Sequence, residues 1–229
     1  MNKIIKSQNR IESKYISNSV DINQLLIKSI KFGFIRTYPK RLVYSLYYDD
    51  DQLTSVKDNL AGITPRRKYR LRWYSYSDKK FFGWQFEIKV KTDNTGHKRI
   101  IKLPNNFDMN NFDLSIKSIC KLTEINDDEF FPNNLKPQLL CNYSRDYYEK
   151  AEGHRLTIDS KLKFTRVRVD SFISNLNLWE NSNFNIMEIK FDPSNKSNLL
   201  ELFRELPFSA TRCSKYLLGH AKLNNFSYL

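Results

Sequence analysis

The chain has 229 residues, 40% of them hydrophobic, and its 38 Lys and Arg against 25 Asp and Glu give a formal net charge of +13. This length suffices for one hydrophobic core, so we expect a single domain over residues 1–229, while the charge predicts an anionic partner: nucleic acid, an anionic membrane or a phosphate-rich small molecule. Neither an apolar signal-peptide region nor a run of 18 apolar residues occurs, which argues against a membrane-spanning helix and makes the cytoplasm the expected location.

Alternation of apolar and polar residues predicts mostly strands. In chain order these are residues 11–16, 41–48, 68–76, 86–91, 98–103, 138–148, 154–164, 165–170 and 186–191. Helical periodicity predicts helices at 21–30, 50–60 (with Asp50 as N-cap), 111–122, 197–206 and 209–219. Short turns between successive strands favour antiparallel pairing, and closure into a barrel would remove the edge strands.

Five of the predicted strands carry charged residues at alternate positions. Lys68, Arg70 and Arg72 show the pattern, and it recurs at Glu12, Lys14, Glu87, Lys89, Lys91, Arg166, Arg168, Glu188 and Lys190. Alternate residues of a strand share one face, and for any one strand a solvated face is the simpler interpretation. Like charges on neighbouring strands repel, however, so five such strands favour a face curled around a water-filled lumen that a polyanion and a cation neutralise.

Side chains, rather than a loop, must hold any phosphate in this chain. Its six glycines form neither GxxxxGK nor GxGxxG, so no phosphate-binding loop is encoded. The three cysteines and three histidines are scattered, which argues against a disulfide framework or a zinc site. A glutamate in the lumen suits a hard cation such as Mg²⁺ or Mn²⁺, which takes its remaining ligands from water and phosphate.

Several motifs occur together in a characteristic order: RIESKY at 10–15, VYSLYYDD at 43–50, NLAGITPRRKYRLRWY at 59–74, FEIKVK at 86–91, YSRDYY at 143–148, RLTID at 155–159, MEIKF at 187–191 and CSKYLLG at 213–219. In these the chain resembles the VTC-type polyphosphate polymerase domain of the triphosphate tunnel metalloenzyme (CYTH-like) superfamily. The resemblance implies an α+β fold: an eight-stranded antiparallel tunnel barrel with helices packed outside and a C-terminal helix that plugs or gates one end.

The resemblance also implies roles for individual residues. Phosphate-clamping residues of the reaction site would be Lys14, Arg70, Arg72, Lys89, Arg145, Arg155 and Lys215. Further substrate contacts would come from Arg212, Ser214 and Lys190, and metal-binding carboxylates from Glu188, Glu12 and Glu87, with Mn²⁺ or Mg²⁺ as cofactor. Tyr47 and Asp49 would instead shape the tunnel wall.

One position departs from the superfamily pattern. Hydrolytic members begin with E-x-E-x-K, whereas here Arg10 precedes Glu12 and Lys14. Loss of that carboxylate favours transfer to another phosphate over hydrolysis, so we expect ATP and polyphosphate as substrates. Two alternatives stay open: a triphosphate hydrolase of the same fold, and a non-catalytic binder of polyphosphate or nucleic acid whose interleaved Tyr and Trp stack on bases. We expect no nucleic acid in the lumen, and any membrane partner would be another chain.

Simpler interpretations exist for single residues. Arg145 fits an edge-strand side chain that extends beside Tyr143 and Tyr147. Glu188 and Lys190 fit a surface ion pair. Lys215 fits a cation near a helix C-terminus.

Overall fold

The computed structural model describes residues 10–76, 80–92, 95–104, 107, 114–123, 132, 134–167, 179–205 and 209–225. Its strands are β1 (Ile11–Ser17), β2 (Ile35–Asp49), β3 (Arg66–Ser75), β4 (Phe81–Thr92), β5 (Thr95–Lys102), β6 (Lys136–Lys150), β7 (His154–Arg166), β8 (Glu180–Asn181) and β9 (Asn185–Phe191). The α-helices are α1 (Ser19–Lys31), α2 (Thr54–Ala61), α3 (Ile116–Thr123), α4 (Leu200–Glu205) and α5 (Lys215–Asn224), with short 3₁₀ segments at Ala151–Gly153 and Pro193–Leu199.

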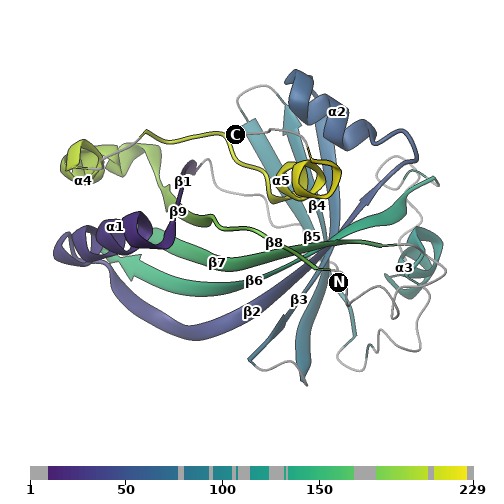
Figure 1. The fold of residues 1–229 in the computed structure, drawn as a ribbon, viewed down its shortest axis with the longest axis horizontal. Coiled ribbons are helices and arrows are strands. Elements are labelled where there is room, and N and C mark those ends of the chain that lie inside the picture. The colour runs from purple at the N-terminus through teal and green to yellow at the C-terminus, as the bar shows by residue number, and fades with distance from the viewer. Residues whose placement is uncertain are drawn as a thin grey trace.

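The strands form one antiparallel sheet in the order β1-β9-β7-β6-β2-β3-β4-β5, and the two-residue β8 pairs with β7. The sheet curls into a half-barrel (Figure 1), so the expected α+β class and antiparallel strands are confirmed. The expected closure is not seen: among the described residues no pairing joins β5 to β1. Part of the β1 edge is instead taken by the segment before α5, where the Thr211 N–H donates to the Lys14 carbonyl at 2.8 Å.

Helices cover both faces of the curled sheet, and each buries apolar residues. On the convex face, α1 and α4 pack over β1, β7 and β9, and α3 packs over β3, β4 and β5. A further hydrophobic cluster lies on the concave face, where α5 packs against β2, β6 and β7 (Figure 1). At Gly219 of α5, a Cβ atom would come within 2.6 Å of Leu139 and 2.7 Å of Phe164, so only glycine lets the helix lie this close to the strands.

A local change in β7 makes room for α5. The strands predicted at 154–164 and 165–170 form one strand, β7, which ends at Arg166. Residues 168–170, and Arg168 with them, lie outside the described residues. Lys161 has a left-handed backbone, with φ of 54°, and the pairing of β6 with β7 shifts between Asn142 and Ser144. Beyond this bulge, Leu162 and Phe164 take the concave face, both fully buried beneath α5, because a one-residue shift exchanges the two faces of a strand.

The helix boundaries differ from those predicted. The last helix begins at Lys215 and runs to Asn224, later than the expected 209–219. The N–H of Thr211 donates to the Lys14 carbonyl of β1 instead of to a helical carbonyl. Helix α2 begins at Thr54 rather than beside Asp50. Asp50 still accepts from the Thr54 N–H, while the buried Asp49 carboxylate accepts from the N–H groups of Ser55 and Val56. Asp49 also accepts from the Tyr216 hydroxyl at 2.9 Å, and so ties α2 to α5.

Candidate active site

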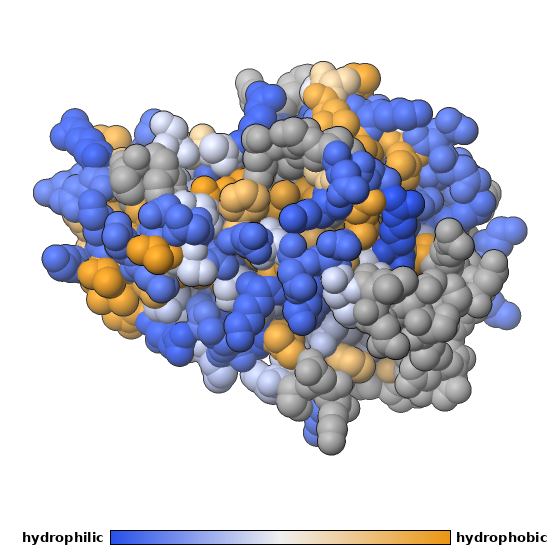
Figure 2. All heavy atoms as spheres, in the orientation of Figure 1, coloured by the Kyte–Doolittle hydropathy of each residue, from blue (hydrophilic) through white to orange (hydrophobic). Residues whose placement is uncertain are grey.

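The charged faces of the strands meet on the concave side. Pairing places the expected residues in cross-strand rows: Glu188 lies opposite both Lys14 and Thr157, Arg70 lies opposite Glu87, and Lys68 lies opposite Lys89. The curl brings β1 toward β3 and β4: Lys14 on β1 and Lys68 on β3 both contact the segment before α5, at Cys213 and Ser214, and the charge of Glu12 acts on Lys89 of β4. Figure 2 shows hydrophilic side chains gathered over the strands beside α5. The alternating pattern therefore forms a continuous charged lining.

Two glutamates and two lysines form a cluster at the β1–β9 pair. Lys14 Nζ lies 2.6 Å from a Glu12 oxygen, and Lys190 Nζ lies 2.7 Å from Glu188 and 3.4 Å from Glu12. Burial opposes ionisation of both glutamates, but the lysines outweigh it and lower the pKa of Glu12 and of Glu188. The pKa of Lys14 is raised because Glu188 and Glu12 outweigh the effect of burial. The cluster thus keeps both carboxylates ionised.

Arg145 and Lys215 share a single buried carboxylate. Asp159, with 0% side-chain exposure, accepts from Arg145 Nε at 2.5 Å and Nη2 at 2.7 Å, and its other ion pair reaches Lys215 Nζ at 2.6 Å. Burial raises the pKa of Asp159, but the two cations lower it further, so the net shift is downward. Tyr143 lies beneath both cations, with 5.3 Å from its ring centre to the Arg145 guanidinium and 4.8 Å to the Lys215 ammonium. Both cations are therefore fixed in place.

This geometry overturns two of the simpler interpretations. Arg145 is not on an edge strand, because β6 lies between β7 and β2 in the middle of the sheet. Lys215 is the first residue of α5, where the helix dipole disfavours a cation. The ion pair with Asp159, rather than the dipole, therefore stabilises the Lys215 ammonium. The third interpretation, an ion pair between Glu188 and Lys190 at the surface, agrees with the structure in part. The two residues pair along one strand, but the Glu188 side chain is only 10% exposed.

Glu87 holds the opposite wall together. This carboxylate, with 1% side-chain exposure, contacts Arg70 and Lys98, and lies 3.8 Å from Arg72. Burial raises its pKa, but these three cations lower it to well below the usual range. Arg72 is further fixed by Ser45 at 3.2 Å and by the Tyr143 hydroxyl at 3.1 Å. Glu87 therefore serves three cations at once, which leaves it less available to a metal ion than Glu12 or Glu188.

Lys68 stands among other cations without a carboxylate contact in the described part of the chain. Its Nζ lies 3.0 Å from Ser214 Oγ, while Lys14 Nζ donates to the Cys213 carbonyl at 3.1 Å. Burial, then the charges of Lys89 and Lys14, lower the pKa of Lys68 to about 7. Burial likewise lowers the pKa of Lys89. Lys14 is balanced by Glu12, but Lys68 has no carboxylate contact of its own among the described residues, and a phosphate would neutralise it.

Arg155 and Arg212 lie toward the outside. Arg155, 57% exposed, pairs with Glu149 at 3.3 Å and lines the rim of a pocket together with Lys190. Arg212 is exposed on the segment before α5, and within the described residues no ion pair or hydrogen bond joins it to the lining. Tyr47 is buried and stacks on Tyr216 of α5, with 4.9 Å between ring centres, a place in the wall like that expected for it and for Asp49.

Two lining residues were not predicted, and the environment of a third was not. Lys98 contacts Glu87 from β5, and its expected strand, 98–103, begins with it, so alternation alone gave no sign of its face. Asp159 lies within the RLTID motif, but an isolated acidic residue in a strand carries no signal of burial. Lys68 was noted in the alternating pattern, and its lack of a carboxylate partner depends on contacts between distant strands.

A divalent cation fits the Glu12–Glu188 cluster. Among the described residues, no three His, Cys, Asp or Glu side chains gather as a metal-binding group. The two ionised carboxylates that share Lys190 provide oxygen donors for a hard cation, which binds through one or two carboxylates together with phosphate oxygens. The lysine ammonium between them shows that this place favours positive charge.

No described helix combines the length and apolar character that crossing a bilayer requires.

The aromatic residues interleaved on β3 do not form an exposed platform for bases: Tyr69 and Trp73 are buried in the convex core.

Comparison with known proteins gives one family and several similar folds. The sequence profile of the VTC domain matches residues 9–224. No curated protein matches the chain. The fold is similar to that of a putative adenylyl cyclase from Hippeastrum, described as having a dominant triphosphatase activity (14% identity, TM-score 0.57, covering 96% of this chain and 97% of that one). It is also similar to the PH1819 protein from Pyrococcus horikoshii (15% identity, TM-score 0.52, covering 94% and 99%).

Proposed function

Because this chain belongs to the VTC domain family, we propose that it is a metal-dependent polyphosphate polymerase, which transfers the γ-phosphoryl group of ATP to a polyphosphate chain. The observation that carries the proposal is the extent of the cationic lining. Cations project from β1, β9, β6, β3, β4, β5 and the start of α5: Lys14, Lys190, Arg145, Lys68, Arg70, Arg72, Lys89, Lys98 and Lys215. These nine cations outnumber the four carboxylates of the lining, Glu12, Glu87, Asp159 and Glu188, so the lining keeps a net positive charge that a polyanion would neutralise.

In the proposed reaction the side chains position phosphates and neutralise their charge. Phosphoryl transfer needs little covalent help from a protein, so fixed cations serve it well. The guanidinium groups of Arg70, Arg72 and Arg145 offer forked donors for phosphate oxygens, and each is held by a buried carboxylate or hydroxyl. Because Glu87 and Asp159 fix these groups before substrate arrives, little reorganisation is needed on binding.

Glu12 and Glu188 would hold the divalent cation. A bound Mg²⁺ or Mn²⁺ would supply further neutralisation of the phosphate oxygens. Lys14 and Lys190 already balance these carboxylates, which would keep the cluster ionised throughout the reaction.

The same cluster favours transfer over hydrolysis. A base that activates water works best with a pKa near the working pH, whereas Glu12 and Glu188 both have lowered pKa values. The position of the first glutamate in hydrolytic relatives is occupied by Arg10, which lies exposed just before β1. Glu12 and Glu188 are therefore poor bases for activating water, while the terminal phosphate of a polymer is itself a nucleophile.

The test is incubation of the purified protein with ATP and Mn²⁺ or Mg²⁺, followed by gels stained for polyphosphate and measurement of free phosphate. We expect a polymer ladder, lost in Glu188→Gln and Arg145→Gln. Lys136→Gln is the matched control, because Lys136 lies on the same strand as Arg145 but pairs with the exposed Asp51 at 2.7 Å. Free phosphate without a ladder would replace the proposal with a triphosphatase, and absence of ATP turnover with either metal would leave a binding protein.

A further inference from the structure

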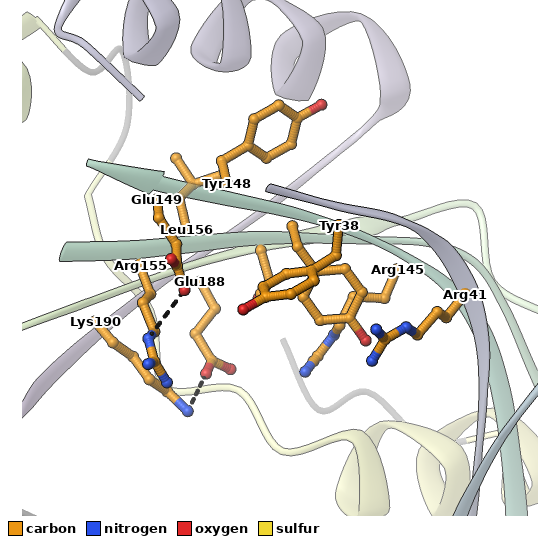
Figure 3. Close-up of a pocket in the computed structure, with 11 residues that line it drawn as sticks. Tyr38, Arg41, Arg145, Tyr148, Glu149, Arg155, Leu156, Glu188 and Lys190 are labelled. Atoms are coloured by element: carbon orange, nitrogen blue, oxygen red, sulfur yellow. Dashed lines mark ion pairs between the residues drawn. The ribbon is translucent and has the colours of Figure 1, made fainter. Parts of the chain in front are cut away.

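A pocket opens on the concave face at the end nearest α1. Its volume is about 260 Å³, close to the lower limit of the ~300–1,000 Å³ that small-molecule pockets span, so it suits part of a ligand. Cross-strand pairing brings its wall together: Tyr38 lies opposite Tyr147, Tyr147 opposite Thr157, and Thr157 opposite Glu188. In Figure 3, Arg41 and Arg145 lie to one side of the Tyr38 ring, and Glu188 and Lys190 to the other.

The pocket carries accessible aromatic rings. Tyr38 is 47% exposed and meets Tyr147 edge to face, with 5.9 Å between ring centres and an angle of 84°. Tyr143 and Tyr47, the tyrosines deeper on this face, are buried beneath Lys215 and Tyr216. A phosphate gains nothing from a ring face, whereas a planar base stacks on it.

Arg41 gives the pocket a guanidinium group that the protein does not neutralise. Its centre lies 5.5 Å from the Tyr38 ring centre and 5.4 Å from that of Tyr147. Within the described residues it has no ion pair, and its Nε is buried without an acceptor. The neighbouring arginines are paired, Arg145 with Asp159 and Arg155 with Glu149. Arg41 therefore lines the pocket without a carboxylate partner among the described residues, and an anionic ligand can supply the counter-charge.

We propose that this pocket holds the nucleoside of the donor nucleotide, with the base against Tyr38 and its triphosphate directed inward past Arg145 toward Lys14 and Lys215. The inference rests on the proposed function in taking a nucleoside triphosphate as donor. Arg145 lies opposite Arg41 in the sheet, and Glu188 lines the same pocket, so a base here places its phosphates at the cluster described above. Because stacking accepts any base, the site discriminates weakly among nucleotides.

The experiment compares the affinities of ATP and inorganic tripolyphosphate by calorimetry, with Mg²⁺ present, for the wild type, Tyr38→Ala and Tyr38→Phe. We expect Tyr38→Ala to weaken ATP binding about tenfold, since loss of one stacking ring has an effect of this order, and to change tripolyphosphate binding less than about twofold. Tyr38→Phe keeps the ring and retains ATP affinity. Phe184→Ala, which removes another half-exposed ring outside the pocket, is the matched control.

Equal losses for ATP and tripolyphosphate in Tyr38→Ala would overturn the inference, because the ring would then support the phosphate site. So would unchanged affinity for both ligands. The outcome for the nucleoside site can be distinguished from that for the polymerase. If Tyr38→Ala weakens ATP binding more than tripolyphosphate binding but no polymer forms, the nucleoside site is supported and the polymerase is not. If polymer forms but Tyr38→Ala affects both ligands alike, the polymerase is supported and the nucleoside site is not.

Discussion

Replacing Asp159 with Asn should destabilise the protein more than any surface charge change. The carboxylate is fully buried, and it holds Arg145 and Lys215, whose side chains are only 15% and 10% exposed. Asn preserves the volume and one acceptor but leaves two buried cations without the carboxylate that both contact, so that Glu188 is the remaining nearby counter-charge. Breaking a buried ion pair in this way costs about 3–5 kcal/mol, and we expect that loss in the free energy of unfolding at pH 7.

The assay is urea denaturation followed by circular dichroism, with Asp51→Asn as control. Asp51 pairs with Lys136, but the two side chains are 66% and 53% exposed, so its loss should cost less than about 1 kcal/mol. The pKa of Asp159 is lowered in the folded state, so its contribution is present above the unfolded pKa, near 4, and is lost as the pH falls through the folded value. The difference between wild type and Asp159→Asn should therefore shrink only below about pH 4. Equal effects of the two substitutions, or a difference that vanishes already near pH 6, would refute the reasoning.

Three further predictions concern other parts of the lining. The pKa of Lys68 is lowered to about 7 in the folded protein, so between about pH 7 and 10 the unfolded chain binds one proton more and the ligand-free protein should gain stability as the pH rises. Binding of tripolyphosphate at pH 8 should take up protons, which calorimetry in two buffers measures. Lys68→Met should reduce both effects. Gly219→Ala should cost about 1–3 kcal/mol in urea denaturation by overpacking against Leu139 and Phe164, and a neutral outcome would mean that α5 sits less tightly. Glu188→Gln should weaken Mn²⁺ binding, measured by calorimetry with tripolyphosphate present, by at least about tenfold, while equal affinity would place the ion elsewhere.

The sequence predicted the charged lining because alternation is a local property. Residues such as Arg70 and Arg72 share a face in any strand, whatever the partner strands are, and the motifs that contain them led to a family resemblance that the profile match confirms. The roles assigned to the individual side chains remain predictions.

What sequence reasoning missed depends on contacts between distant segments. Strict alternation through residues 154–164 would place Lys161 and Lys163 beside Asp159, whereas the bulge at Lys161 turns Leu162 and Phe164 inward beneath α5. The openness of the sheet was missed for a similar reason: the strand pattern does not reveal that residues around Thr211 occupy part of the β1 edge. Bulges and edge contacts are set by tertiary packing, which overrides local periodicity.

The segment before α5 bears on how the concave face would retain a bound polyanion. Thr211 and Cys213 contact Lys14 on β1, and Ser214 contacts Lys68 on β3, so this segment lies between the two arms of the curled sheet. Within the described residues no backbone pairing joins β5 to β1. If the protein forms a polymer as proposed, retention of that polymer would depend on the attraction between its phosphates and lysines such as Lys14 and Lys68, which salt screens. Ionic strength would then affect how long each product grows before it dissociates.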